Sequence, residues 1–228
     1  MAKSVRIKRK ELLNQPDQFI STTDILIAYG SKHKTGIMSV VAVLVLVVLA
    51  GVGIKYNNNV KTLRMESLYY EMEQAKAAKG TKPQEVISKM ENLLSEFSEG
   101  PQKQRATLIL ADELYNTRAY DRAIPLYKDV LTDTSPAKLP YQLASVGMAH
   151  SLEGKKDYKG AIVAYKTIIE SQNKYPLFHV YLSLARCYEL SKDQNGALLT
   201  LREMTTKFSD HSNIGLVEAQ LKKLETPA

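Results

Sequence analysis

Hydrophobic positions along the chain follow two patterns that change near residue 55. From Ile37 to Ile54 the residues are apolar, with no charged side chain and a single hydroxyl at Ser39. A helix rises 1.5 Å per residue, so this run would be roughly 27 Å long, close to the thickness of the hydrocarbon core of a bilayer. The pattern predicts a transmembrane helix over residues 37–55.

After this segment, apolar residues recur every three or four positions, as in Leu63, Leu68, Met72 and Ala75. This spacing is typical of amphipathic helices, and glycine and proline residues fall between the periodic stretches. No alternating apolar and polar run is long enough to predict a strand. We therefore expect an all-α domain.

The helices repeat. Alanines at 123, 161 and 197 are separated by 38 and 36 residues, and each has a bulky residue four positions later. A small side chain lets two helices approach closely, and a large one a turn later fills the space beside it. The expected packing residues are Ala123, Tyr127, Ala161, Tyr165, Ala197 and Leu201. A weaker copy lies 37 residues before Ala123, which predicts about four helical pairs.

The first helix of each pair is aligned by a small residue followed three positions later by a larger one. The three candidate pairs of positions are Ala111 with Leu114, Gly147 with His150, and Ala185 with Tyr188. With this alignment Gly154 is the turn glycine of the third unit, and Lys155 and Lys156 are two extra residues in its turn.

These features resemble tetratricopeptide repeats over about residues 60 to 208. The resemblance implies a single transmembrane helix followed by a tetratricopeptide-like α-solenoid, closed by a C-terminal capping helix. The expected segments are a basic cytoplasmic arm (1–36), the transmembrane helix (37–55), a linker or stalk with a degenerate first repeat (56–99), three repeats (100–209), and the capping helix with its tail (210–228).

The charge of the chain, +7 overall, is unevenly distributed. Residues 1–35 contain seven lysines and arginines but three acidic residues. Positive residues beside a membrane helix favour the cytoplasmic side, so we expect a cytoplasmic N-terminus and, in a bacterium, a periplasmic C-terminal domain at the inner membrane. The same basic excess would attract the lipid bilayer and needs no nucleic acid to explain it. An alternative is cleavage after Ala50, which would give a freely periplasmic protein.

This layout, together with the arm sequence KRKELLNQPDQF, resembles the ancillary SecYEG translocon subunit family of bacterial inner-membrane proteins. The resemblance implies a membrane-anchored scaffold or adaptor with protein partners, namely the secretion translocon and periplasmic chaperones. The alternative is a structural subunit or assembly factor of another cell-envelope complex.

Nothing in the chain indicates catalysis or a cofactor. The four histidines and Cys187 lack the spacing of metal ligands, and there is no glycine-rich phosphate loop outside the membrane segment. We therefore expect no enzyme activity, no metal and no cofactor.

The expected binding surface is the groove lined by the first helix of each unit. Counting from the small positions, the expected groove residues are Leu108, Asp112, Tyr115, Tyr141, Met148, Ser151, His179, Leu182, Arg186 and Glu189.

Overall fold

The computed structural model describes residues 18–77, 80, 82–171 and 175–226, and these residues form helices joined by turns and loops, without strands. The expected all-α architecture is confirmed. The helices are α2 (Gln18–Lys32), α3 (Lys34–Ala77), α4 (Pro83–Ser95), α5 (Pro101–Asn116), α6 (Tyr120–Asp133), α7 (Leu139–Gly154), α8 (Tyr158–Glu170), α9 (Phe178–Leu190), α10 (Gln194–Lys207) and α11 (Ile214–Glu225).

The chain divides into two units, residues 1–61 and 62–228. The first contains α2 and the apolar part of α3. None of the apolar window of α3 is buried inside the protein, and its length and composition suffice to cross a membrane. The first 17 residues of the expected basic arm, including the KRKELLNQ stretch, lie outside the described residues.

Helix α3 continues through the polar residues Tyr56 to Asn59 and ends at Ala77. No glycine or proline interrupts the chain between Gly53 and Ala77, so the change from apolar to polar composition does not end the helix. Beyond residue 61, Met65, Leu68 and Met72 are buried in a core shared with α4 and α5. This part of α3 is the first helix of the first pair.

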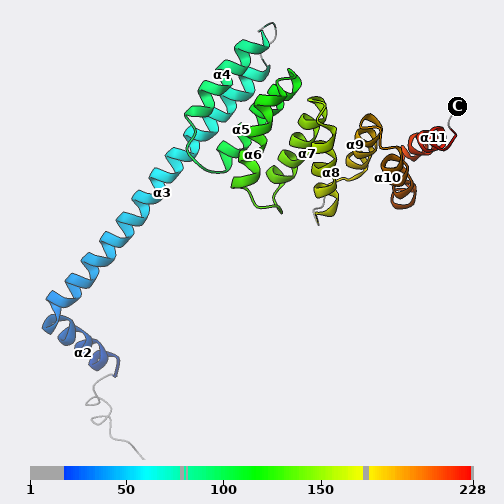
Figure 1. Ribbon diagram of the computed structural model, residues 1–228. Coiled ribbons are helices and arrows are strands. Elements are labelled where there is room, and N and C mark those ends of the chain that lie inside the picture. Colours follow the sequence, from blue (N-terminus) through cyan, green and yellow to red (C-terminus); the bar gives the residue numbers. More distant parts are fainter. Residues whose placement is uncertain (1–17, 78–79, 81, 172–174, 227–228) are drawn as a thin grey trace, which may run out of the picture. The chain divides into compact units, whose positions relative to one another are not determined.

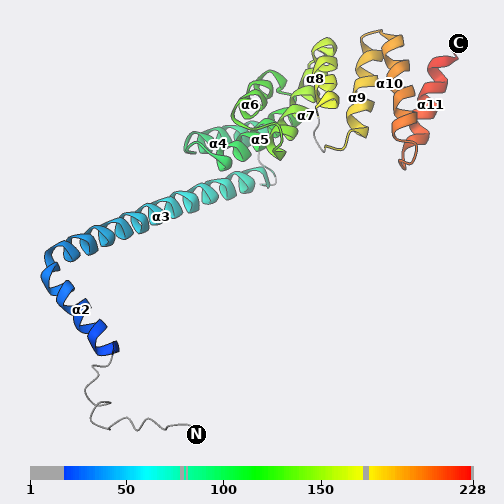
Figure 2. The same ribbon diagram turned by 90° about the horizontal axis from the view of Figure 1, so that it is seen from below.

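The second unit is a stack of helical pairs. In Figures 1 and 2, α5 to α11 follow one another as a row of helices, each beside the next. The end of α3 pairs with α4, and the later pairs are α5 with α6, α7 with α8, and α9 with α10. Three hydrophobic clusters follow one another along the stack, centred on α3–α6, α7–α9 and α9–α11.

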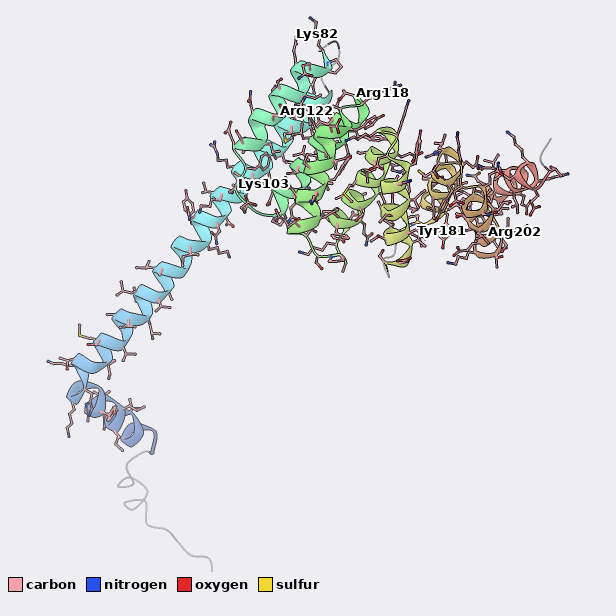
Figure 3. The ribbon with its side chains drawn as sticks, viewed as in Figure 1. Lys82, Lys103, Arg118, Arg122, Tyr181 and Arg202 are labelled. Atoms are coloured by element: carbon pink, nitrogen blue, oxygen red, sulfur yellow. The ribbon has the colours of Figure 1, made fainter. Side chains whose placement is uncertain are left out.

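Ion pairs on the surface link neighbouring pairs. Arg122 on α6 lies 2.5 Å from Glu91 on α4, and Arg202 on α10 lies 2.7 Å from Glu225 on α11. Figure 3 labels the two arginines. Val217 of α11 is fully buried in the last cluster. Helix α11 therefore covers the apolar end of the stack.

The turns inside the last three pairs have the same geometry. Arg118, Lys156 and Lys192 adopt positive φ angles of 62°, 68° and 65°. In each turn the N–H of the following residue bonds to a carbonyl five positions earlier, as from Ala119 to Leu114 at 2.8 Å. This is the Schellman arrangement that ends a helix. The prediction of two extra residues at Lys155 and Lys156 is wrong, because all three turns have equal length.

The alignment of α7 on Gly147 is also wrong. When positions are counted back from the turns, Ala149 on α7 is the equivalent of Ala111 and Ala185. All three alanines are fully buried. Gly147 has another role: a Cβ atom there would lie 2.5 Å from the Tyr127 ring. Gly154 is the last residue of α7 and lies against Tyr120, so it is not a turn residue.

Candidate functional site

The corrected alignment places polar side chains at two equivalent positions on α5, α7 and α9. Asp112, His150 and Arg186 each lie six positions before the positive-φ residue of their turn. Tyr115, Glu153 and Glu189 each lie three positions before it. We call these six residues the first-helix row. Contacts between its members and with the helices behind them show that they form one continuous surface.

At the α5 end of the row, Asp112 accepts a hydrogen bond of 2.6 Å from the hydroxyl of Tyr127 on α6. The Tyr127 side chain is buried, and burial raises the pKa of its hydroxyl, with the bond to Asp112 raising it further. Because that bond uses the protonated hydroxyl, it joins the two helices of the pair and fixes the carboxylate on the surface.

In the next unit, Tyr165 on α8 is equivalent to Tyr127. Its hydroxyl lies 2.8 Å from Nδ1 of His150 and 2.8 Å from Oε2 of Glu153. Burial raises the pKa of Tyr165, and the negative charge of Glu153 adds to the effect. The same tyrosine position therefore holds one acidic group in the second unit and a histidine with a glutamate in the third.

Arg186 crosses from α9 to α7. Its Nε lies 2.5 Å from Oε1 of Glu153, and its Nη2 lies 3.0 Å from Oε2. Two parallel bonds of this kind define both the distance and the orientation of the pair. The position equivalent to Tyr165 in the fourth unit is Leu201, which has no hydroxyl, and Arg186 bonds to the carboxylate of the preceding unit.

Glu153 is the most constrained carboxylate of the row. Burial alone would raise its pKa, but the nearby His150 and the hydrogen bonds from Arg186 and Tyr165 stabilise the charged form and lower the pKa to about 2. Glu153 is therefore ionised throughout the physiological pH range and ties α7 to α8 and α9.

Both ends of the row have further contacts. The ring of Tyr115 lies 5.7 Å from that of Tyr120 and 6.4 Å from that of His150. Glu189 accepts a hydrogen bond from the amide of Gln220 on α11. The row thus runs from α5 to the capping helix, with polar atoms held by partners inside the stack.

The expected groove residues do not all lie together. Asp112, Tyr115, Arg186 and Glu189 belong to the row, and Leu108 and Leu182 precede its α5 and α9 members by one helical turn. His179 is exposed near the start of α9.

The three residues expected on α7 lie elsewhere. Tyr141 and Met148 line a cavity against α8, and Ser151 is fully buried, with its hydroxyl bonded to the carbonyl oxygen of Gly147 at 2.8 Å. The α7 members of the row are His150 and Glu153. The equal turn lengths would have identified them, since counting back from Lys156 leads to these two positions.

The six expected packing residues are buried, each with 1% or less of its surface exposed. They lie on the inner faces of α6, α8 and α10. The ends of the predicted membrane segment, Ile37 and Ile54, are 43% and 64% exposed within α3.

Metal ligands do not gather in the described part of the chain, where no group of three or more histidine, cysteine, aspartate or glutamate residues could hold an ion. Cys187 is buried, and burial raises the pKa of its thiol to about 12, with the nearby Glu153 raising it further. A buried, protonated thiol is a packing group and not a nucleophile at neutral pH.

Comparison with known proteins supports the repeat architecture. Residues 32–171, more than half of the chain, match the family described as tetratricopeptide repeat-like domain. No curated protein sequence matches the chain.

Two solved structures illustrate the shared fold. One is a Podosopora anserina protein described as a kinesin light chain with nearly identical TPR-like repeats: 14% identity, 71% of this chain, 84% of that chain and a TM-score of 0.55. The other is a double mutant of MamA from strain RS-1: 14% identity, 72% of this chain, 87% of that chain and a TM-score of 0.50. At this identity, the likeness shows a common stack of helical pairs.

Proposed function

Because the chain belongs to the tetratricopeptide repeat-like domain family, we propose that it is a membrane-anchored scaffold that binds proteins through its first-helix row. The observation that carries this proposal is the presence of both parts in one chain: an apolar helical segment with no protein around it, and a stack of repeats whose first helices present a continuous polar surface. Repeat stacks of this kind act as extended binding surfaces.

The apolar part of α3 supports the membrane anchor. Its large side chains between Ile37 and Ile54 are 43% to 69% exposed. Such a continuous apolar surface is unfavourable in water and suits a bilayer. The basic excess of residues 1–35 favours a cytoplasmic N-terminus, so the repeats would lie in the periplasm of a bacterial inner-membrane protein.

We further propose that the partners are the secretion translocon and periplasmic chaperones. The support is the arrangement of basic arm, single span and repeat domain, which resembles the ancillary translocon subunits. Anchoring raises the concentration of the repeats near partners in the same membrane, so a weak interaction is enough.

Topology can be tested with single cysteines in a Cys187→Ala background. Asn195 is exposed at the start of α10, so Asn195→Cys should react with a membrane-impermeant maleimide added to spheroplasts. Lys32→Cys lies on the cytoplasmic side in our proposal, so it should react with the maleimide only after the spheroplasts are lysed. The reverse pattern of labelling would refute the proposed orientation.

The partners can be tested by photocrosslinking from Tyr115, with Leu199 on α10 as a control position outside the row. We expect translocon or chaperone subunits to be captured from Tyr115. Capture of components of another envelope complex alone would replace the translocon assignment, and capture of the same proteins from Leu199 would remove the row from the proposal.

The charge of the row can be inverted without breaking its central ion pair. Arg186→Glu alone would put two carboxylates together, whereas the double variant Glu153→Arg/Arg186→Glu keeps opposite charges in contact. We expect the double variant to retain its helical signal in circular dichroism and to lose most partner capture. Unchanged capture would show that these charges are not recognised.

A further inference from the structure

A second surface lies between the second helices of successive pairs. The same groove recurs three times, and its edge carries an exposed apolar residue at one equivalent position: Pro125 on α6, Val163 on α8 and Leu199 on α10. We call the one between α6, α7 and α8 the middle groove. Because the three grooves are lined by equivalent positions, their side chains can be compared position by position.

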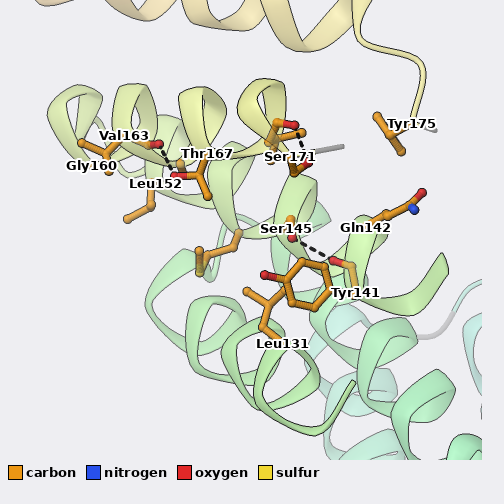
Figure 4. A pocket seen from close by; sticks show the side chains of 13 residues that line it. Leu131, Tyr141, Gln142, Ser145, Leu152, Gly160, Val163, Thr167, Ser171 and Tyr175 are labelled. Atoms are coloured by element: carbon orange, nitrogen blue, oxygen red, sulfur yellow. Dashed lines mark hydrogen bonds between the residues drawn. The ribbon is translucent and has the colours of Figure 1, made fainter. Parts of the chain in front are cut away.

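The grooves on either side contain charged residues. Asp129 and Asp133 line the preceding one, and Glu203 and Lys207 occupy the equivalent positions in the following one. In the middle groove these positions are Thr167 and Ser171. Among the thirteen described residues that line the middle groove, none is charged (Figure 4). A charged ligand would lose its hydration there without gaining a partner of opposite charge.

Two lining positions of the middle groove carry smaller side chains than the equivalent positions of its neighbours. Ala164 replaces Leu126 of the preceding groove, and Ser145 replaces Tyr181 of the following one. Gly160 is glycine for a separate reason. Its N–H donates a hydrogen bond to the carboxylate of Asp157, and a Cβ atom at this position would lie 2.5 Å from that carboxylate. The middle groove contains a cavity of about 270 Å³ with Met148 and Leu152 among its lining residues.

The neighbouring grooves carry larger side chains at these two positions, Leu126 in the preceding groove and Tyr181, 1% exposed, in the following one. The middle groove has neither side chain, and its described lining residues are uncharged. An external aliphatic or aromatic side chain would bury apolar surface there.

Polar groups near the cavity could hold the backbone that carries such a side chain. In the described chain the hydroxyls of Tyr141 and Tyr175 and the amide of Gln142 line the groove and make no hydrogen bond within the protein. An amide can both donate to a peptide carbonyl and accept from a peptide N–H. Figure 4 shows Tyr141, Gln142 and Tyr175 beside the groove.

We propose that the middle groove is a second docking site, which takes one uncharged leucine-like or phenylalanine-like side chain from a peptide segment of a protein partner. The proposal rests on the scaffold function and adds a specific chemistry to it. The first-helix row supplies charged and polar contacts, whereas this groove reads a single apolar anchor, a division that recurs in protein interfaces.

The test uses the full chain in phosphatidylcholine nanodiscs with its methionine methyl groups labelled for NMR. Met148 lines the groove, while Met72, Met90 and Met204 are buried in the cores of other pairs and serve as internal references. The probes are N-acetyl-leucinamide, N-acetyl-phenylalaninamide and N-acetyl-lysinamide. We expect the first two to shift the Met148 signal with dissociation constants on the order of millimolar, and the lysine derivative to leave it unchanged.

Two variants sharpen the result. Ala164→Leu copies the preceding groove and should weaken binding at least tenfold, as should Val163→Asp at the exposed edge. Leu199→Asp places the same charge at the equivalent edge of the following groove and should leave binding unchanged. Because both edge residues are about two-thirds exposed, neither aspartate should disturb folding.

The proposal is overturned if Met148 does not respond, if the lysine derivative binds as well, or if Ala164→Leu binds like the wild type. A Met148 shift that depends on protein concentration alone would assign the groove to a second copy of the chain and also overturn it. These outcomes leave the scaffold function standing if crosslinking from Tyr115 still captures its partners.

Discussion

Arg186 on α9 and Glu153 on α7 form a two-bond ion pair that joins the third and fourth helical pairs. The carboxylate is largely enclosed, with 12% of its side chain exposed, while half of the arginine side chain remains in solvent. The buried partner therefore depends more on this contact than the exposed one does. This asymmetry, together with the bond from Tyr165 to Glu153, leads to predictions on stability.

Acid should weaken this junction. The pKa of Glu153 in the folded protein is about 2, compared with an ordinary value of 4.5. Its contribution to stability is complete above pH 4.5 and is lost as the pH falls from 4.5 towards 2. The loss reaches roughly 2 kcal/mol at pH 3. Urea unfolding followed by circular dichroism should show that Glu153→Gln removes this part of the pH dependence. Glu218→Gln, an exposed change on α11, should not, and equal effects of the two variants would contradict the prediction.

Replacing Glu153 by alanine should lower the free energy of unfolding more than replacing Arg186. Glu153→Ala leaves Arg186 and Tyr165 without their shared acceptor and should lower the free energy of unfolding by about 1–3 kcal/mol. Arg186→Ala should cost less, about 0.5–1.5 kcal/mol, because its guanidinium can still be hydrated. A double-mutant cycle measures the coupling between them. If the cycle gave no coupling, the ion pair would not contribute to the junction.

Cys187 should report on unfolding. It is fully buried, and with a pKa of about 12 it is protonated at neutral pH. A thiol reagent at pH 8 should therefore react with the native chain at least about a hundredfold more slowly than with the unfolded chain, since attack requires an exposed thiolate. Asn195→Cys in a Cys187→Ala chain provides the exposed control. Fast labelling of native Cys187 would show that the α8–α9 core opens readily.

The sequence was sufficient for the second helices of the repeats and misleading for one first helix. Ala123, Ala161 and Ala197 are each followed four positions later by a bulky residue, so their spacing identifies the register directly. On α7, Gly147 and Ala149 are both small and only two residues apart, and the pattern does not show which one faces the neighbouring helix. The turn before α8 also lacks glycine at its positive-φ residue, Lys156, so its length could not be recognised from composition.

The site was only partly predictable for the same reason. A shift of two residues on a helix moves a position by more than half a turn, which exchanges His150 and Glu153 for Met148 and Ser151. The contact between Arg186 and Glu153 joins residues 33 positions apart, and such a contact becomes visible when the side chains are seen together.

Gly147 provides a direct test of the corrected alignment. Alanine normally stabilises a helix relative to glycine by about 0.5–1 kcal/mol, and Gly215→Ala on α11, where a Cβ meets nothing within 4 Å, should show this gain. At Gly147 the added Cβ would lie 2.5 Å from the ring of Tyr127, whose hydroxyl is held by Asp112. The ring cannot move without losing that bond, so Gly147→Ala should instead lower the free energy of unfolding by about 1–3 kcal/mol. Urea unfolding of both variants measures the difference. If Gly147→Ala were as stabilising as Gly215→Ala, the close approach of α6 and α7 at this position would be wrong.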